Sequence, residues 1–327
     1  MRDRLEPQSI LVVRALPGLG DLLCMVPALR ALRHAFPQAK IALIGLAGAQ
    51  EFVDRFSHYV DEWIEFPGFP GIPEVAIDPV RISTFLSQMP QFDLALQLHG
   101  NGSVMNIFVA LLAAKQSAGF YLSDRFCPAP AFYLPYPDRL PEVRRSLHLL
   151  QFLGIPLQGE QLEFPLTADE QAMKWPFERY VCLHPGASVA SRRWPIAQFA
   201  AVGDRLAAQG FQILLTGTAI EAELTEAVQA QMQHQAIDLA GKTDLGSLAV
   251  LLRSARLLVC NDTGVSHLAA ALQTPSIVLF SDSDLNRWRP IDRQIHHAID
   301  TRLEGDRGLG RAIEQSLELL KRECAHV

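Results

Sequence analysis

The stretch "ILVVRALPGLGDLL", residues 10–23, decides the fold of the first half of the chain. Four apolar residues come first, as in a buried strand, and a long amphipathic stretch follows, as in a helix. Between them lies a turn that contains two glycines, Gly18 and Gly20, and one carboxylate, Asp21. A strand, a tight turn and a helix in this order are typical of the first unit of a parallel α/β sheet.

The glycines of this turn match only part of the dinucleotide-binding fingerprint G-x-G-x-x-G. Its third glycine position holds Leu23, which argues against a nicotinamide-dependent oxidoreductase. Asp21 at the mouth of the turn would repel a phosphate group, so either the turn binds no phosphate or this carboxylate has another function. Its simplest structural role would be to cap a helix that we expect over residues 21–36.

Length and composition limit the possible classes of protein. A chain of 327 residues favours two domains of about 150 residues each. The net charge of −6 argues against a nucleic-acid partner. Five cysteines, odd in number and without a C-x-x-C pair, argue against both a disulfide framework and a zinc site. We expect a cytoplasmic protein with reduced thiols, without a secretion signal or a membrane span.

Strand-like runs alternate with helical periodicity along both halves of the chain, the pattern of a doubly wound α/β protein. In the first half we expect strands over 10–14, 40–46, 61–66, 92–98 and 117–121, and helices over 21–36, 49–56, 80–89, 103–114 and 143–153. A composition break near "FPLTADEQAMKWPFE" marks the domain boundary. The predicted domains span 1–166 and 167–305, and a final helix over 306–327 could pack back on the first domain.

The second half repeats this rhythm, so we expect two Rossmann-like domains that face each other across a cleft. Strands are predicted in "YVCLH", "FQILLTG", "ARLLVC" and "PSIVLF", with a short one in "AIDLA", and helices over 195–209 and 220–233 and in "DLGSLAVLLRS" and "VSHLAAALQT". Ligands of such sheets bind beyond the carboxyl ends of the strands. The loops after the strands should therefore line the cleft.

The most informative of these loops is "VCNDTGVSHLAAAL", where a buried strand ends at Cys260 and a helix of small residues follows. The free N–H groups of the first helical turn and the hydroxyl of Thr263 predict an anion site suited to a diphosphate. His267 falls in the same turn. The structural alternative is that Asp262 or Thr263 only caps the helix.

A second loop, "HPGASVASRRWP", follows the first strand of the second half. Ser188 could donate to a phosphate oxygen, and Arg192 or Arg193 could stabilise the charge of a departing diphosphate. The structural alternative is that the two arginines lie at a solvated helix start. Together with the turn around Thr263, the loop predicts a nucleotide-diphosphate site.

Five segments together resemble glycosyltransferase family 9, the enzymes similar to ADP-heptose:lipopolysaccharide heptosyltransferases. The segments are residues 10–44, "RRSLHLLQFLGI", "HPGASVASRRWP", "LAGKTDLGSLAVLLRSARLLVCNDTGVSHLAAAL" and "VLFSDSDLNRWRP". The resemblance implies a GT-B fold, with an N-terminal acceptor domain and a C-terminal nucleotide-sugar domain. It also implies metal-independent, inverting transfer of a sugar, with heptose on ADP as the expected donor.

The resemblance also assigns roles to residues. The catalytic base falls on Asp21. Beside the resemblance, the residues themselves suggest an acceptor site, because Gly18 and Gly20 would leave room for an acceptor and His99, at the end of a strand that faces the cleft, could bind its hydroxyls or have a structural role only. The donor site falls on Ser188, Arg192, Glu221, Thr243, Asp262, Thr263, Gly264 and His267. Arg192 stands where the family has a lysine, and the acid for the ribose is Glu221 or, with a gap, Glu223. Thr243 replaces a bulkier residue near the base, so the identity of the base stays open.

The chain departs from the family pattern after the strand in "VLFSDSDLNRWRP". There Asp282 and Asp284 form a D-x-D pair. Such a pair chelates Mn²⁺ or Mg²⁺ in another glycosyltransferase fold, but the family pattern already explains Asp284, so we expect no metal and no cofactor. The expected partners are a nucleotide sugar and a glycan or glycolipid acceptor such as lipopolysaccharide core. We expect a monomer in peripheral contact with the inner membrane face. A different donor sugar or nucleotide and a catalytically silent nucleotide-sugar-binding protein are the alternatives.

Overall fold

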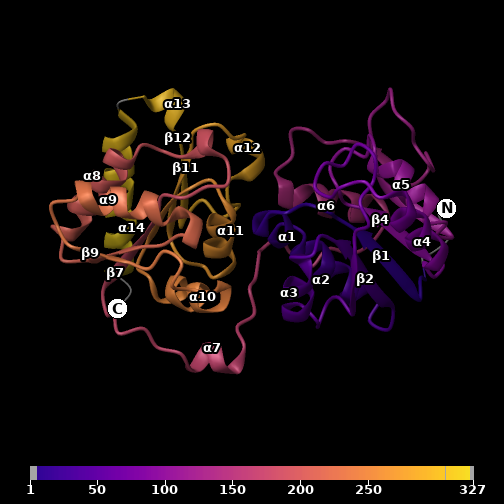
Figure 1. The fold of residues 1–327 in the computed structure, drawn as a ribbon, viewed down its shortest axis with the longest axis horizontal. Coiled ribbons are helices and arrows are strands. Elements are labelled where there is room, and N and C mark those ends of the chain that lie inside the picture. The colour runs from indigo at the N-terminus through magenta and orange to yellow at the C-terminus, as the bar shows by residue number, and fades with distance from the viewer. Residues whose placement is uncertain (1–5, 306, 325–327) are drawn as a thin grey trace. The chain divides into compact units, whose positions relative to one another are not determined.

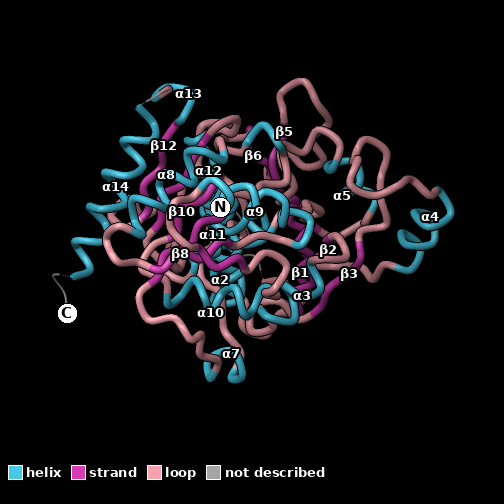
Figure 2. Tube along the Cα trace, turned by 60° about the vertical axis from the view of Figure 1, so that its left-hand side comes forward, coloured by secondary structure: helices cyan, strands magenta, loops and turns pink. Residues whose placement is uncertain are grey.

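The computed structural model describes residues 6–305 and 307–324, and the chain divides into two compact units, 1–160 and 161–327. Each unit contains one six-stranded parallel sheet with helices packed around it (Figures 1 and 2). This confirms the doubly wound α/β class expected from the alternating pattern. The expected domain limits at residues 166 and 305 stay predictions.

The first unit follows the strand and helix order expected for a Rossmann-like sheet. Its elements are β1 (Ser9–Val13), α1 (Leu19–Leu23), α2 (Val26–Ala35), β2 (Lys40–Gly45), α3 (Ala49–Arg55), β3 (Glu62–Glu65), α4 (Pro79–Gln88), β4 (Leu94–Gln97), α5 (Met105–Leu111), β5 (Gln116–Tyr121), β6 (Tyr133–Pro135) and α6 (Glu142–Phe152). The strand order is β3-β2-β1-β4-β5-β6. The chain therefore leaves β1 in one direction for β2 and β3, and returns to its other side with β4.

The long helix expected over 21–36 is wrong, because the structure has two helices there, α1 and α2. Pro27 stands at the second position of α2 and has no N–H group, so a continuous helix would leave the carbonyl of Leu23 without its donor. The first helix also begins earlier than expected, with Gly18 as its N-cap. Asp21 lies inside its first turn and Gly18 holds the N-cap position, so the expectation that Asp21 is the N-cap of a helix over 21–36 is wrong.

The second unit has the same plan. Its elements are α7 (Ala168–Ala172), β7 (Tyr180–His184), the 3-10 helix η1 (Ala190–Arg192), α8 (Ile196–Ala207), β8 (Gln212–Leu215), the 3-10 helix η2 (Ala219–Glu221), α9 (Ala222–Gln231), β9 (Ala236–Asp238), α10 (Leu245–Ser254), β10 (Leu258–Asn261), α11 (Gly264–Ala271), β11 (Ser276–Phe280), α12 (Leu285–Trp288), β12 (His296–Asp300), α13 (Thr301–Glu304) and α14 (Arg307–Cys324). The strand order is β12-β11-β10-β7-β8-β9. Here the chain reverses between β7 and β10.

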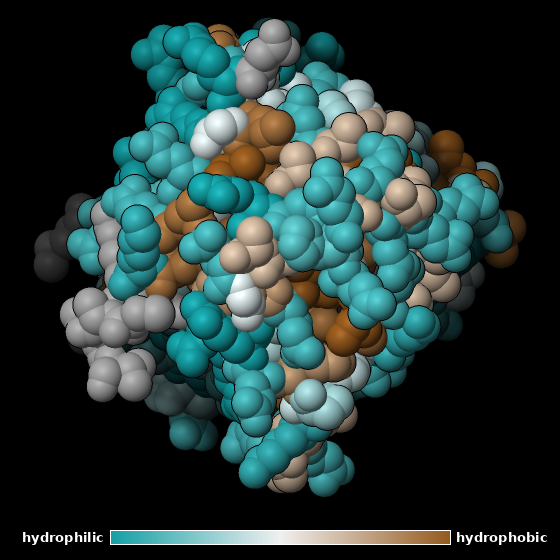
Figure 3. Space-filling model, turned by 90° about the vertical axis from the view of Figure 1, so that its left-hand side faces the viewer, coloured by the Kyte–Doolittle hydropathy of each residue, from teal (hydrophilic) through white to brown (hydrophobic). Residues whose placement is uncertain are grey.

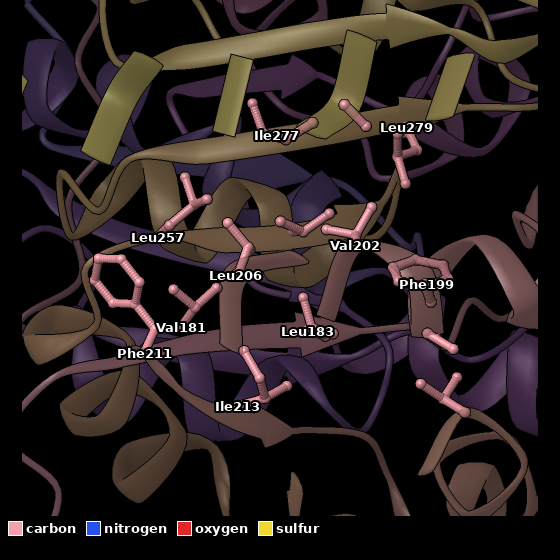
Figure 4. Close-up of a cluster of buried hydrophobic side chains, with 14 of the residues drawn as sticks. Val181, Leu183, Phe199, Val202, Leu206, Phe211, Ile213, Leu257, Ile277 and Leu279 are labelled. Carbon is pink, nitrogen blue, oxygen red and sulfur yellow. The ribbon is translucent and has the colours of Figure 1, made fainter. Parts of the chain in front are cut away.

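The core of the second unit lies between one face of its sheet and the helices α8 and α14. Figure 4 shows alternate strand residues, which point to one face of a sheet, packed against Phe199, Val202 and Leu206 of α8. The strand residues are Val181 and Leu183, Ile213, and Ile277 and Leu279. Buried residues of α14 join the same core. On the side where α8, α9 and α14 lie, hydrophilic atoms flank a narrow hydrophobic band (Figure 3).

Helix α14 is the final helix that the sequence predicts over 306–327, although 306 and 325–327 lie outside the described residues. Its buried residues Ala312, Leu319 and Leu320 belong to the core of the second unit. Packing of this helix on the first domain stays a prediction. Within the described ranges, no helix is both long enough and apolar enough to cross a membrane.

Candidate functional site

In the first unit, the loops that follow β1 and β4 meet at the carboxyl edge of the sheet, where these neighbouring strands end. The amide of Ala15 donates to Nδ1 of His99 at 3.2 Å, which joins the two loops directly. The side chain of Gln97 donates to the carbonyl of His99 at 2.6 Å and fixes the second loop. A reversal of strand order opens a crevice for ligands at such a point.

His99 is a neutral ring at neutral pH. Burial, and then the positive charge of Arg14, lowers the pKa of His99 to about 4. Since its Nδ1 accepts the amide of Ala15, the ring proton is on Nε2. His99 therefore presents an uncharged N–H donor at this edge, which suits a hydroxyl oxygen.

Asp21 faces the same region from the first turn of α1. Its Oδ1 accepts a hydrogen bond from Nη2 of Arg14 at 3.1 Å, and Arg14 is 2% exposed against 20% for Asp21. Nη2 also donates to Oε1 of Glu142 at 2.8 Å, and Nη1 donates to the carbonyl of Leu98 at 2.7 Å. Burial opposes the charge of Arg14, but Glu142 and Asp21 outweigh it and raise the pKa of the guanidinium.

Glu142, the first residue of α6, is held from its other side by Arg145. Nη1 of Arg145 donates to Oε2 of Glu142 at 3.2 Å and also to the hydroxyl of Tyr136. Both Glu142 and Arg145 are 4% exposed. Two arginines and two carboxylates thus alternate in a chain that ends at Asp21, and buried charges of this kind need such pairing.

Gly18 leaves room for the carboxylate of Asp21. A Cβ atom at Gly18 would lie 2.5 Å from Oδ2 of Asp21, so any other residue would push this carboxylate away. Gly20 is buried within α1. The glycines of the opening turn therefore shape the surroundings of Asp21.

In the second unit, Asn261 at the end of β10 ties together the loops of the carboxyl edge. Its Oδ1 accepts the amide of Trp194 at 2.9 Å, and its Nδ2 donates to the carbonyl of Pro185 at 2.8 Å. The side chain is fully buried. These bonds hold the loop after β7 beside the turn after β10, at the point where the strand order reverses.

The turn after β10 leads into α11 with Thr263 as its N-cap. The side chain of Thr263 makes no capping hydrogen bond, so the capping alternative is wrong for Thr263. Gly264 is the first helical residue, and Asp262 is 3% exposed. His267 is buried within the first turn, with its ring centroid 6.0 Å from that of Trp288. The first amides of α11 and the Thr263 hydroxyl can together receive an anion.

The loop after β7 carries the two arginines and the serine expected at the site. Ser188 is exposed, and Arg193 donates from Nε to the carbonyl of Ala187 at 3.0 Å. Arg192 ends η1, and none of the described residues accepts a hydrogen bond from its guanidinium. Of the two arginines, Arg192 therefore has the charge available for a ligand.

Glu221 and Thr243 lie on two further loops of this edge. Oε2 of Glu221 accepts the amide and the hydroxyl of Thr218, both at 2.9 Å. A Cβ atom at Gly186 would lie 2.2 Å from Oε1 of Glu221, so the carboxylate rests against that glycine. Thr243 is half-buried just before α10, and Glu223 lies in the first turn of α9. Glu221 thus approaches the loop after β7, and it is 9% exposed.

The D-x-D pair divides into two different roles. Asp284 is the N-cap of α12 and accepts the amide of Asn286 at 2.9 Å. Asp282 is exposed, and its charge acts on Arg302. Over residues 6–305 and 307–324, no three His, Cys, Asp or Glu side chains gather as a metal-binding group.

Three residues at these edges were not identified as site residues in the sequence. Glu142 is 128 residues from Arg14, and only the folded unit brings it to the pair that Arg14 forms with Asp21, seven residues further along the chain. Asn261 is part of the turn that the sequence singles out, but its two long-range hydrogen bonds are not visible from local pattern. Arg14 and Asn261 are polar residues at the ends of apolar strands, a signal that could have marked them, whereas Glu142 at the start of α6 carries no such signal.

The chain matches the protein family described as "Glycosyltransferase family 9 (heptosyltransferase)" over residues 88–306. It is 30% identical over 301 residues to lipopolysaccharide heptosyltransferase 2 of Escherichia coli K12, an alignment that covers 84% of each chain.

Two solved structures have a similar fold. One is a family 9 glycosyltransferase from Veillonella parvula DSM 2008, with a TM-score of 0.77 and 20% identity, covering 98% of this chain and 99% of the other. The second is the Escherichia coli ADP-heptose lipopolysaccharide heptosyltransferase II, with a TM-score of 0.73 and 23% identity, covering 96% and 99%. These likenesses confirm the GT-B fold that the sequence predicts.

Proposed function

The chain belongs to glycosyltransferase family 9, and we propose that it moves a heptose from ADP-heptose to a hydroxyl group of lipopolysaccharide core. The observation that carries the proposal is the similarity to the Escherichia coli lipopolysaccharide heptosyltransferase 2, which extends over 84% of both chains. The donor is inferred from the ADP-heptose in the name of the structural neighbour. The sequence features already argue against an oxidoreductase.

We propose that Asp21 is the general base. Its carboxylate would accept the proton of the acceptor hydroxyl while the acceptor oxygen forms a bond to the anomeric carbon of the donor. The bond from that carbon to the diphosphate oxygen breaks on the opposite face, and ADP leaves with the electron pair. This step inverts the anomeric configuration. Support comes from the ion pair with Arg14, which holds one carboxylate oxygen of Asp21 in place.

The departing diphosphate would be stabilised by groups of the second unit. The amides at the start of α11, the hydroxyls of Thr263 and Ser188, and the guanidinium of Arg192 would bind its oxygens. The lack of a described hydrogen-bond acceptor for Arg192 supports this role. No metal ion is required in this scheme, because the cation and the helix terminus supply the positive charge.

The remaining residues would position the two substrates. Glu221 would accept the ribose hydroxyls, and Thr243 would lie beside the base. Asp262 and His267 would shape the turn that holds the diphosphate. In the first unit, the neutral N–H of His99 would donate to an acceptor hydroxyl, and Gly18 and Gly20 would leave room for it.

We further propose that the enzyme works as a monomer in the cytoplasm, with peripheral contact to the inner membrane face. A glycolipid acceptor places the reaction at a lipid surface, and this proposal needs no membrane-spanning helix.

Mass spectrometry tests the proposed function directly. The protein is incubated with ADP-heptose and with lipopolysaccharide from a heptose-deficient strain, and the product is examined for one added heptose and for released ADP. The Asp21→Asn variant and a reaction without acceptor are the controls. Transfer from another nucleotide sugar, but not from ADP-heptose, would show that the proposed donor is wrong, and it would not affect the family assignment. Release of ADP without addition of a heptose to the lipopolysaccharide would show that the proposed acceptor is wrong.

A further inference from the structure

A separate cavity lies around the start of β12, at the amino edge of the second sheet. His296 is the first residue of β12 and pairs in register with Ser276, the first residue of β11. The cavity has a volume of about 230 Å³ and is lined by Arg289, Arg293, His297 and Gln315 in addition to His296. The turn before α11 lies at the opposite, carboxyl edge of the sheet.

Two guanidinium groups line this cavity without a counter-charge close by. Burial, and then the positive charge of Arg293, lowers the pKa of Arg289. Among the described residues, no carboxylate lies within 4.0 Å of either guanidinium. Two like charges near each other, one of them half-buried, are a site that an anion would stabilise.

Three further side chains of the cavity have a buried polar atom without a hydrogen-bond partner. These atoms are Nε2 of His296, Nδ1 of His297 and Oε1 of Gln315. His296 is 3% exposed, and its Nδ1 lies 2.9 Å from the hydroxyl of Ser276. When that hydroxyl donates to Nδ1, the ring proton is on Nε2, which is then a buried donor that lacks an acceptor. Buried donors of this kind are normally paired, if not with protein then with water or an ion.

One acidic group, Asp292, acts on a side chain of the cavity. The charge of Asp292 acts on His296, and Oδ1 of Asp292 accepts the amide of Gln294 at 2.9 Å. His267 and His297 act on the same ring with the opposite sign. The carboxylate of Asp292 acts on His296 but is not among the residues that line the cavity, whereas two guanidinium groups are.

We propose that this cavity binds a phosphate group, presented as free phosphate or as a lipid phosphomonoester. The planar forks of Arg289 and Arg293 match the oxygens of a tetrahedral anion, and Nε2 of His296 supplies a further donor. The side-chain amide of Gln315 can turn its nitrogen toward the anion. The site is distinct from the proposed diphosphate turn and does not depend on the proposed function.

Histidine-ring NMR detects occupancy at this cavity directly. The full chain, labelled with ¹⁵N, is titrated with inorganic phosphate at constant ionic strength, and ring signals are assigned with the His296→Asn and His297→Asn variants. Phosphate should shift the signals of both rings in the parent protein. In Arg289→Gln/Arg293→Gln the same shifts should need at least about tenfold more phosphate, because the affinity falls by that factor or more. Equal shifts with potassium chloride alone would overturn the proposal.

Two further variants serve as controls. Arg205→Gln/Arg253→Gln removes the same charge from exposed arginines at the ends of α8 and α10, and it should keep the phosphate-induced shifts. Thr263→Val changes the turn before α11 and should keep them as well. Loss of the shifts in the arginine control would mean that phosphate responds to net charge alone. Loss of the shifts in Thr263→Val would mean that phosphate binds at the turn before α11. Either result would contradict the proposal.

Gln315→Glu tests the same site by adding a negative charge instead of removing positive ones. It places a carboxylate of nearly the same size among the cavity-lining arginines, so it should abolish phosphate binding. In phosphate-free buffer it should raise the melting temperature, because the guanidinium groups gain a counter-charge. A lower melting temperature together with unchanged phosphate binding would contradict the site, even if Arg289→Gln/Arg293→Gln fails to fold.

Vesicle flotation separates the two sources of the phosphate group. Phosphatidylcholine vesicles with phosphatidate are compared with pure phosphatidylcholine vesicles. Flotation of the parent protein, but not of Arg289→Gln/Arg293→Gln, with the phosphatidate vesicles alone would assign a lipid phosphomonoester. Shifts with inorganic phosphate but no flotation would assign the free anion. If the protein shows no phosphate-induced shifts and does not float with either kind of vesicle, the proposal is wrong.

Discussion

Nη2 of Arg14 lies 3.1 Å from Oδ1 of Asp21, so the carboxylate at the opening turn is one half of an ion pair. The same nitrogen lies 2.8 Å from Oε1 of Glu142. Arg14, a permanent cation, therefore lies between two carboxylates and holds one oxygen of Asp21 in place.

Replacing Arg14 by methionine should destabilise the fold strongly. The change leaves Glu142 buried without this partner, and removal of one side of a buried pair costs about 3–5 kcal/mol. The free energy of unfolding in urea measures the loss. The double variant Arg14→Met/Glu142→Gln should recover part of it, because the uncompensated charge is gone. A double variant that is less stable than Arg14→Met would contradict this account.

Asp21→Asn should separate catalysis from folding. The amide oxygen can still accept the hydrogen bond of Arg14, so the melting temperature and the affinity for ADP should stay close to those of the parent. The amide cannot accept a proton, so kcat should fall at least about 100-fold. Asp78→Asn, which changes the exposed N-cap of α4, is the matched control and should leave turnover unchanged. Near-native turnover of Asp21→Asn would remove the catalytic role.

Thr263→Val tests the diphosphate turn. The hydroxyl of Thr263 makes no capping hydrogen bond, so the substitution should leave the melting temperature almost unchanged. Binding of ADP, measured by calorimetry, should weaken by about 1–3 kcal/mol if the hydroxyl donates to the nucleotide. Thr274→Val provides the reverse control, because the hydroxyl of Thr274 donates to the carbonyl of Leu252 at 2.9 Å. That variant should lose stability and keep its ADP affinity.

Turnover should not depend on a divalent cation. Asp284 is engaged as the N-cap of α12, and Asp282 is exposed near Arg302. We therefore expect the rate of sugar transfer to be the same in excess EDTA and in added Mn²⁺ or Mg²⁺, and to be unchanged in Asp282→Asn. A rate that vanishes with EDTA and returns with either ion would show that the metal-free scheme is wrong.

Acid should destabilise the protein through two histidines. Burial lowers the pKa of His99 and of His296 to about 4, below the ordinary value of 6.5. Between these values the unfolded chain binds more protons, so the free energy of unfolding falls as the pH falls. The loss should be about 2 kcal/mol for each histidine between about pH 7 and about pH 5. Urea titrations of His99→Asn and His296→Asn, which cannot be protonated there, should show a smaller loss than the parent. An unchanged pH dependence would contradict the assignment.

The sequence predicts the fold well because apolar runs in parallel sheets are local signals. The run at residues 10–13 is fully buried in β1, and the turns at both strand-order reversals carry the polar residues that were singled out. β12 was missed, since "HHAID" contains too few apolar residues to stand out. The interruption between α1 and α2 was also missed. It depends on one proline, Pro27, and the helical pattern of apolar residues otherwise continues through it.

The candidate site was less predictable because its supports are distant in sequence. Asp21 could be named from its turn, but its surroundings include Glu142, which is brought close only when α6 packs on the first sheet. The capping interpretation of Asp21 was wrong because the helix begins two residues earlier, after Gly18. Local sequence identifies the reactive group, and only tertiary structure supplies its electrostatic partners.

The hydrogen bonds of Asn261 also constrain the order in which parts of the second unit can fold during synthesis. The loop that contains Pro185 and Trp194 is made early, but its anchor is 67 to 76 residues further along the chain. β10 must leave the ribosome and insert beside β7 before that loop is fixed. A nascent chain that stalls before residue 261 would hold β8 and β9 with an incomplete ligand-binding edge. On the proposed function, the ability to bind a nucleotide would therefore appear only after β10 docks beside β7.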